Sequence, residues 1–166
     1  MAFLNRAGNH QFEKPVKTTI FTIINPIDLG FFYDQPQAYR VVKNNSMSAE
    51  KNLSIAHLWF DAFNAHNLEK LLSLYDDEAE HFSPKLKIRH PETNGLVTGK
   101  EALRTWWQDA FERLPSLHYK VTSLTANSDR VFMEYIRTVA NEPEMLVAEV
   151  LEIKENRIIA SRVYHG

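Results

Sequence analysis

The sequence predicts an α+β domain in which helices cover one face of a mainly antiparallel sheet. Between residues 48 and 114, apolar residues recur at the spacing of amphipathic helices in separate stretches. After residue 116, four stretches of about ten residues alternate with short turns, as in consecutive antiparallel strands. One further strand lies between the helices. The expected order is therefore α-α-β-α-β-β-β-β, and the three helices can cover the sheet.

Length and composition fit one globular domain with an appendage. The chain has 166 residues, of which 44% are hydrophobic and 24% charged, and its net charge is −2. Because no run of Lys and Arg occurs, we expect no nucleic-acid partner. No apolar stretch approaches the ~20 residues of a membrane span, so we expect no membrane partner. The absence of cysteine excludes disulfides and thiol catalysis, and it fits a cytoplasmic protein.

The first 46 residues differ from the rest, and we expect them to be an N-terminal extension to a domain at 47–166. Three prolines would interrupt any helix or strand in this segment. Two interpretations stand: an accessory arm that packs on the domain or on a partner subunit, or a poorly ordered extension. We expect the second, because Met47 leads directly into a helix with Ser48 as its N-cap and is a natural start.

Two helices are expected to open the domain, with a sharp break between them. The apolar periodicity predicts an amphipathic helix from Ser48 to about Phe63. The polar residues that follow break this helix, and Asn67 can cap a short helix over residues 68–75. A short strand is expected at 79–84.

Residues 85–98 are expected to form a loop, because they contain the turn signals His90-Pro91 and Asn94-Gly95. A loop of this length is uncommon in a compact domain and often has a function. The third helix is expected at 100–114 and is ended by Pro115.

The C-terminal part is expected to be sheet. Short polar turns separate the segments, so consecutive strands should pair antiparallel. The expected strands are residues 117–126, 130–140, 145–154 and 157–165.

The most informative position for chemistry is Glu149, in the middle of the third of these strands. Its neighbours on the same strand face are all apolar: Met145, Val147, Leu151 and Ile153. A carboxyl group in an apolar setting has a raised pKa and can act as an acid or as a hydrogen-bond donor. The alternative is structural: Glu149 forms an ion pair with Arg137 or Arg162, or the opposite strand face is the buried one.

Glu134 raises the same question on the preceding strand. If its face also lines a cavity, two carboxylates lie near each other. In the alternative, Glu134 faces solvent, and Met133 and Tyr135 face the core.

Three histidines lie on or beside expected strands and could act as general bases: His81, His118 and His165. The histidines show no metal-ligand spacing, so we expect no metal site. The sequence also lacks a nucleophile elbow, a phosphate-binding glycine loop and a dinucleotide motif, so we expect no cofactor.

With these elements in place, the chain resembles the SnoaL-like family of the nuclear transport factor 2-like (ketosteroid isomerase-like) superfamily. The resemblance covers about residues 52–166. It rests on the segments WFDAFNAHNLEKL (59–71), LYDDEA (74–79), GKEAL (99–103) and residues 147–162. It implies a cone-shaped α+β barrel, in which a curled sheet wraps the helices around a mostly apolar pocket. Many members of such families are dimers packed through the sheet, so we expect a homodimer.

Comparison with the ketosteroid isomerase pattern assigns three polar roles to positions in this chain. The helix tyrosine of that pattern falls on Trp59, and its general-base aspartate falls on Ser83. Its oxyanion-hole carboxylic acid falls on Glu149. A serine cannot replace a carboxylate as a proton shuttle without a partner base, so steroid isomerase activity is not expected.

These observations leave two hypotheses. The first is a cofactor-free isomerase, cyclase or dehydratase acting on a small apolar carbonyl compound. Its candidate catalytic residues are Glu149 as the proton holder or donor, and His81 or His118 as the base. The second is a non-catalytic domain that binds a small ligand or serves as a dimeric scaffold. In either case we expect the pocket to include Trp59, Phe63, Ser83, Trp107, Glu134 and Tyr164.

Overall fold

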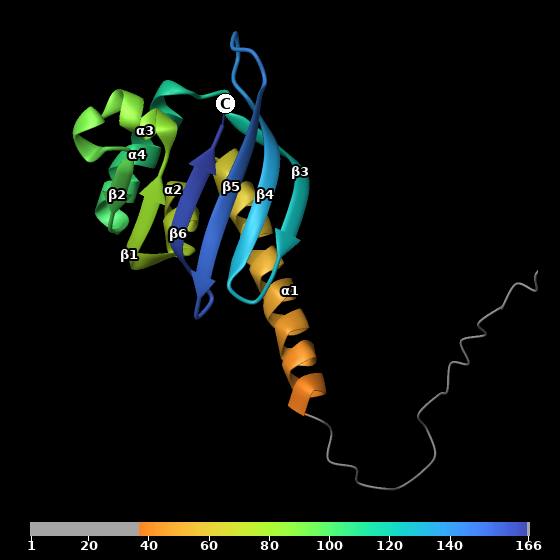
Figure 1. Ribbon diagram of the computed structural model, residues 1–166. Coiled ribbons are helices and arrows are strands. Elements are labelled where there is room, and N and C mark those ends of the chain that lie inside the picture. Colours follow the sequence, from red (N-terminus) through yellow and green to blue (C-terminus); the bar gives the residue numbers. More distant parts are fainter. Residues whose placement is uncertain (1–36, 166) are drawn as a thin grey trace, which may run out of the picture. The chain divides into compact units, whose positions relative to one another are not determined.

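The computed structural model describes residues 37–165, with side chains from residue 47 onward, and it confirms the α+β class (Figure 1). The helices are α1 (Gln37–Asn64), α2 (Leu68–Ser73), α3 (Pro84–Arg89), the 3-10 turn η1 (Pro91–Thr93) and α4 (Lys100–Arg113). The strands are β1 (Tyr75–Phe82), β2 (Leu96–Thr98), β3 (His118–Ala126), β4 (Arg130–Thr138), β5 (Met145–Lys154) and β6 (Arg157–Tyr164).

The six strands form one curled sheet in the order β2-β1-β6-β5-β4-β3. Neighbouring strands run antiparallel except β1 and β6, which are parallel. The register shifts within the β1–β6, β3–β4 and β5–β6 pairs. Such bulges strengthen the twist and bend the strands, which lets the sheet curl around the helices.

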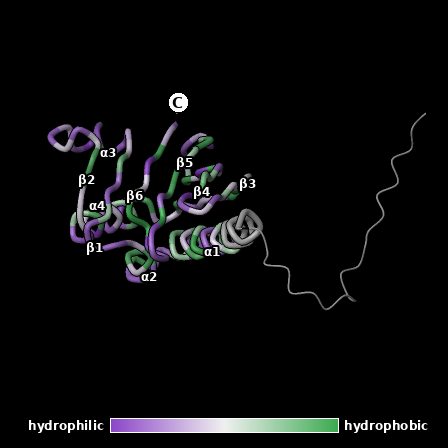
Figure 2. The backbone as a smooth tube through the Cα atoms, turned by 60° about the horizontal axis from the view of Figure 1, so that its bottom comes forward, coloured by the Kyte–Doolittle hydropathy of each residue, from purple (hydrophilic) through white to green (hydrophobic). Residues whose placement is uncertain are grey.

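Helices α1, α2 and α4 contact one side of the sheet, which we call the inner face (Figure 2). The apolar side of α1, with Trp59, Phe60 and Phe63, is buried against β3 and β4. Helix α4 buries Leu103 and Trp107 against β1. The core is therefore a layer of large apolar side chains between helices and sheet, which is where the hydrophobic stabilisation of this fold arises.

The expected start of the first helix is wrong. Helix α1 begins at Gln37, so Ser48 lies inside the helix and is not its N-cap. The expected domain boundary between residues 46 and 47 falls within this helix. Residues 1–36 lie outside the described part of the chain, so the nature of the extension stays a prediction.

The second helix and the first strand meet earlier than expected. Asn67 does cap α2, since its side chain accepts a hydrogen bond from the Lys70 backbone N–H at 3.0 Å. The helix stops at Ser73, however, and the strand begins at Tyr75. The buried Tyr75 pairs with Ile158 of β6, and this tertiary pairing overrides the local helical tendency.

The expected loop at 85–98 contains three short elements. Pro84 takes the first position of α3, where a missing N–H has no cost. The predicted turn signals separate the pieces. His90 lies between α3 and η1, which begins at Pro91, and Asn94-Gly95 leads into β2. Gly95 has a φ of +88°, a backbone conformation that favours glycine.

Candidate functional site

A cavity of about 200 Å³ lies between the inner face of the sheet and helices α1, α3 and α4. Six residues predicted to form the site line it: Trp59, Phe63, His81, Ser83, Trp107 and Glu149. They come from α1, β1, α4 and β5, and Ser83 joins β1 to α3. The cavity is smaller than the ~300–1,000 Å³ of pockets for drug-sized ligands, so it suits a molecule of one or two rings.

Glu149 lies at the wall of this cavity and is only 1% exposed. The Tyr135 hydroxyl donates a hydrogen bond to its Oε2 at 2.7 Å. Its Oε1 is buried and has no hydrogen-bond partner among the described residues. Burial raises the pKa of Glu149 to about 7, and the Tyr135 hydrogen bond opposes this shift. Both protonation states are therefore populated near neutral pH.

The two structural alternatives named for Glu149, an ion pair with Arg137 or Arg162 and burial of the opposite strand face, are not found. Arg137 donates to Glu142 at 2.8 Å, and Arg162 donates to Glu152 at 2.6 Å, so neither cation pairs with Glu149. The buried strand face is the one predicted from its apolar neighbours, since Val147, Leu151 and Ile153 are buried with it.

His81 is buried on the inner face of β1 and belongs to a chain of hydrogen bonds. The Trp59 indole N–H donates to the Tyr75 hydroxyl at 2.9 Å, and this hydroxyl donates to Ser161 Oγ at 3.4 Å. Ser161 Oγ lies 2.7 Å from His81 Nδ1. Burial lowers the pKa of His81 to about 4, so its ring is neutral at pH 7.

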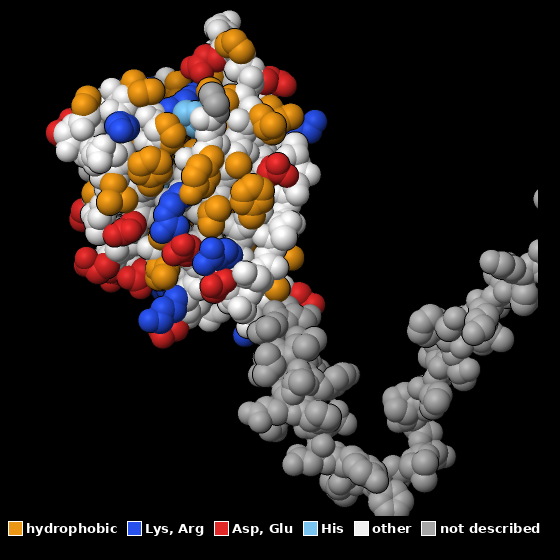
Figure 3. Space-filling model, in the orientation of Figure 1, with side chains coloured by type: hydrophobic (Ala, Val, Ile, Leu, Met, Phe, Trp, Pro, Cys, Tyr) orange, Lys and Arg blue, Asp and Glu red, His pale blue; other side chains and the backbone are white. Residues whose placement is uncertain are grey.

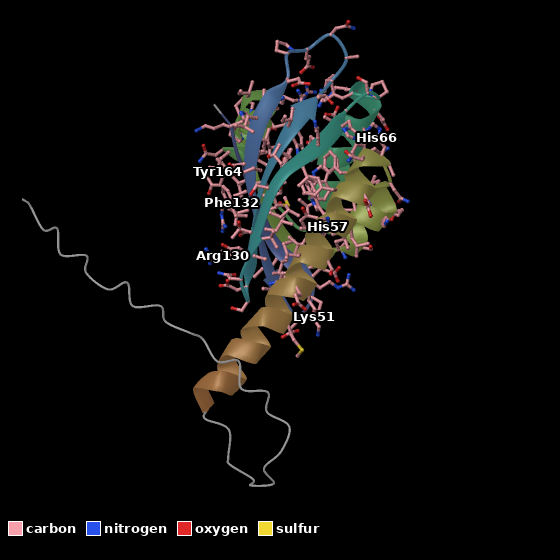
Figure 4. All side chains as sticks on the ribbon, turned by 90° about the vertical axis from the view of Figure 1, so that its right-hand side faces the viewer. Lys51, His57, His66, Arg130, Phe132 and Tyr164 are labelled. Atoms are coloured by element: carbon pink, nitrogen blue, oxygen red, sulfur yellow. The ribbon has the colours of Figure 1, made fainter. Side chains whose placement is uncertain are left out.

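Three predicted site residues lie outside the cavity. His118 is exposed at the start of β3, so the structure does not bring it to Glu149. Glu134 pairs with Ala148 across β4 and β5. It is the residue next to the inward-facing Tyr135, so its side chain points to the opposite face of the sheet, which we call the outer face. Tyr164 is 52% exposed on the same outer face, where Figure 4 shows it on the side away from α1.

Aromatic residues that the sequence did not single out for the site form much of its wall. The ring of Tyr119 stacks on that of Trp59 with centroids 5.8 Å apart, and it lies 4.5 Å from the ring of Tyr135. Burial, aided by the charge of Glu149, raises the pKa of both tyrosines well above 10, so their hydroxyls stay protonated. The alternation of β4, with Met133, Tyr135 and Arg137 facing inward, was the signal that could have found Tyr135.

The described part of the chain contains no group of three or more histidine and carboxylate side chains arranged to hold a metal ion. None of its helices is long and apolar enough to cross a membrane.

Comparisons with known proteins fit this architecture. The sequence profile of the family described as "SnoaL-like domain" matches residues 56–161. The chain is similar to the structure of a SnoaL-like protein from Burkholderia thailandensis, with 28% identity and a TM-score of 0.63, covering 70% of this chain and 95% of that one. No match was found among curated proteins.

Two further solved structures share the fold at lower identity. A candidate ketosteroid isomerase from Kribbella flavida is 18% identical with a TM-score of 0.60, covering 72% of this chain and 80% of that one. A candidate polyketide cyclase from Sinorhizobium meliloti is 16% identical with a TM-score of 0.57, covering 67% of this chain and 94% of that one.

Proposed function

Because this chain belongs to the SnoaL-like domain family, we propose that it transfers protons on a small, largely apolar carbonyl compound bound in the cavity. The observation that carries the proposal is the buried Glu149 carboxyl, whose pKa is raised to about 7. A group that titrates near the working pH is the most effective general acid or base. The reaction class is an isomerisation, cyclisation or dehydration, and a proton transfer of this kind needs no cofactor.

In this proposal Glu149 is the proton carrier. As a carboxylate it removes a proton from the carbon next to the carbonyl group, and as a carboxylic acid it returns the proton to another atom. The Tyr135 hydroxyl, 2.7 Å from Oε2, holds the carboxyl group in position, and the partnerless Oε1 is free to take the proton. The surrounding aromatic wall excludes water, which protects the carbanion-like intermediate.

His81 is assigned the opposite role from the one expected, because a ring with a pKa of about 4 is a weak base. Indole N–H groups only donate, so the Tyr75 hydroxyl accepts from Trp59 and donates its own hydrogen bond to Ser161 Oγ. The Ser161 hydroxyl has no other acceptor among the described residues than His81 Nδ1. This order places the ring proton of neutral His81 on Nε2, where it can donate to the substrate oxygen.

The alternative function is the binding of a small apolar molecule without chemical change. The presence of Ser83 in the cavity, at the position where the isomerase pattern has a carboxylate, supports this alternative. It differs from the first proposal in one observable respect: ligand protons would not exchange with solvent.

The test uses 2-tetralone, a two-ring ketone with acidic protons beside its carbonyl group. The protein and the ketone are mixed in deuterated buffer, and NMR measures how fast these protons exchange for deuterium. We expect the wild-type protein to accelerate exchange of these protons, with a rate that rises through pH ~7 as Glu149 becomes a carboxylate. Glu149→Gln should lose at least about 100-fold of the acceleration. Glu134→Gln, which removes a carboxylate from the outer face of the neighbouring strand, is the matched control and should keep it.

Two outcomes would count against the proposal. Equal rates for Glu149→Gln and wild type would remove Glu149 from the reaction. Binding of 2-tetralone without accelerated exchange would favour the non-catalytic alternative.

A further inference from the structure

The cavity opens through a rim of cations. Its more exposed lining residues include Lys85 and Arg89 of α3 and Arg113 of α4, and the buried Arg137 of β4 lies beside them. Four positive side chains in the lining of a pocket with apolar walls are not needed to bind a neutral ligand.

The carboxylates nearby do not neutralise these cations. Asp109 is shared between Arg113, at 2.8 Å, and Arg89, at 3.5 Å. Glu142 pairs with Arg137 at 2.8 Å but is itself 43% exposed on the turn after β4. Two carboxylates therefore face four cations, and an excess of positive charge remains at the rim.

Lys85 and Arg137 are the two cations with donors left for a ligand. Lys85 is half-buried and forms no ion pair or hydrogen bond among the described residues. The side chain of Arg137 is 7% exposed, and only one of its N–H groups is engaged, by Glu142. The other N–H groups of Arg137, which lines the cavity, are therefore available to a ligand.

The cations that line the cavity are close enough to shift one another's pKa values. Burial lowers the pKa of Lys85, and repulsion from Arg137 and Arg113 lowers it further, with Glu142 opposing. The pKa of His165 is lowered by burial and by the same Lys85 and Arg137. His165 also lines the cavity, and its Nε2 is buried without a hydrogen-bond partner among the described residues.

We propose that the natural ligand carries an anionic group, a carboxylate or a phosphate, which binds Lys85 and Arg137 at the rim while its apolar ring enters the cavity. This inference rests on the proposed function, because it names the class of molecule that the pocket holds. The anion completes the donors of Lys85 and Arg137, and it fixes which carbon of the ring system faces Glu149.

The test compares 2-naphthoate with 2-naphthamide, which share one ring system and differ in charge. Binding is followed by quenching of the tryptophans that line the cavity, Trp59, Trp106 and Trp107. We expect naphthoate to bind at least about tenfold more tightly than naphthamide, because charge-assisted hydrogen bonds replace neutral ones. This preference should shrink as salt is raised, since Lys85 is only half-buried.

Lys85→Gln should lose most of the preference for naphthoate over naphthamide. Lys87→Gln is the matched control, because it removes the same charge from an exposed position of α3 that does not line the cavity. Arg137→Gln should lose the preference as well, and a thermal unfolding scan checks that this buried variant remains folded.

The possible failures can be told apart. Equal affinity for the two probes in the wild type would overturn the anion site but leave the proposed proton transfer standing. An equal loss of preference in Lys87→Gln and Lys85→Gln would also overturn it, since general surface charge would then explain the effect. Binding of neither probe would overturn both this inference and the proposed ligand pocket.

Discussion

At the scale of single residues, Glu149 makes the stability of the protein depend on pH. Its pKa is about 7 in the folded protein, against an ordinary value of 4.5. A raised pKa means that the folded state holds the proton more tightly than the unfolded state. The stabilisation is therefore complete below pH 4.5 and is lost as the pH rises through 7. The buried Glu149 carboxylate therefore weakens the fold at alkaline pH.

This dependence predicts the behaviour of Glu149→Gln. The amide carries no charge at any pH, so the variant should match the wild type near pH 4.5 and exceed it at pH 8 by up to roughly 3 kcal/mol. Urea unfolding at the two pH values measures the difference. His81, whose lowered pKa makes stability fall at acid pH, is present in both proteins and cancels in the comparison. Parallel stability curves would show that Glu149 has a normal pKa.

Tyr135 provides a second prediction at this scale. Its hydroxyl donates to the Glu149 carboxyl and lowers the pKa that burial raises. Tyr135→Phe removes the hydroxyl and keeps the ring, so the pKa of Glu149 should rise above 7. Carboxyl-carbon NMR titration measures this value, with Glu149→Gln identifying the signal. Tyr119→Phe is the control, because Tyr119 has no hydrogen bond to Glu149. An unchanged value in Tyr135→Phe would contradict the geometry.

At the scale of elements, strand alternation carried most of the information that the sequence held about the site. It placed Glu149 among apolar neighbours on β5, and the structure buries that face. The same alternation left Glu134 with two interpretations, because one residue of register decides its face. Burial of Tyr135 and pairing of Glu134 with Ala148 decide it in favour of the outer face.

Other parts of the site depend on pairing between distant segments and could not be predicted locally. His81 reaches Ser161 because β1 lies parallel to β6, and 80 residues separate the two. The rim cation Lys85 is positioned by α3, which occupies a segment that reads as a loop. Family resemblance indicated the cone-shaped fold, which the comparisons confirm, but it did not indicate the cations of the rim.

The two glycines that flank β2 give a further prediction. Gly95 and Gly99 both have a φ of +88°. A Cβ on Gly95 would lie 3.0 Å from a ring carbon of Phe82 and 3.2 Å from the Ser83 carbonyl oxygen, whereas one on Gly99 would lie 3.8 Å from its nearest neighbour. Alanine at either site costs about 1–3 kcal/mol for the backbone alone.

We therefore expect Gly95→Ala to destabilise the protein more than Gly99→Ala, by the additional cost of the clash. Denaturant unfolding of the two variants measures this. Because Ser83 lines the cavity, Gly95→Ala should also weaken ligand binding, and Gly99→Ala should not. Equal stability of the two variants would mean that the turn moves to make room.

At the scale of the whole molecule, the outer face of the sheet exposes large apolar side chains. Figure 3 shows hydrophobic side chains gathered over β4, β5 and β6. Leu146 is 67% exposed, Tyr164 52% and Phe132 40%, and we call these three the outer patch. The ion pair of Arg162 with Glu152 lies on the same face. Apolar patches of this kind mark interaction surfaces.

We propose that a second copy of this chain covers the outer patch, as expected from the resemblance. The patch joins apolar residues to charges of both signs, so it can be self-complementary about a two-fold axis. Light scattering should give the mass of a dimer for the wild type and of a monomer for Leu146→Glu, because a carboxylate would be buried in the interface. Ile88→Glu is the matched control, since Ile88 is 76% exposed on α3 outside the patch. It should remain dimeric, and a monomeric wild type at micromolar concentration would contradict the proposal. Glu149 lies on the other face of the sheet, so a monomeric Leu146→Glu variant should still exchange the protons of 2-tetralone.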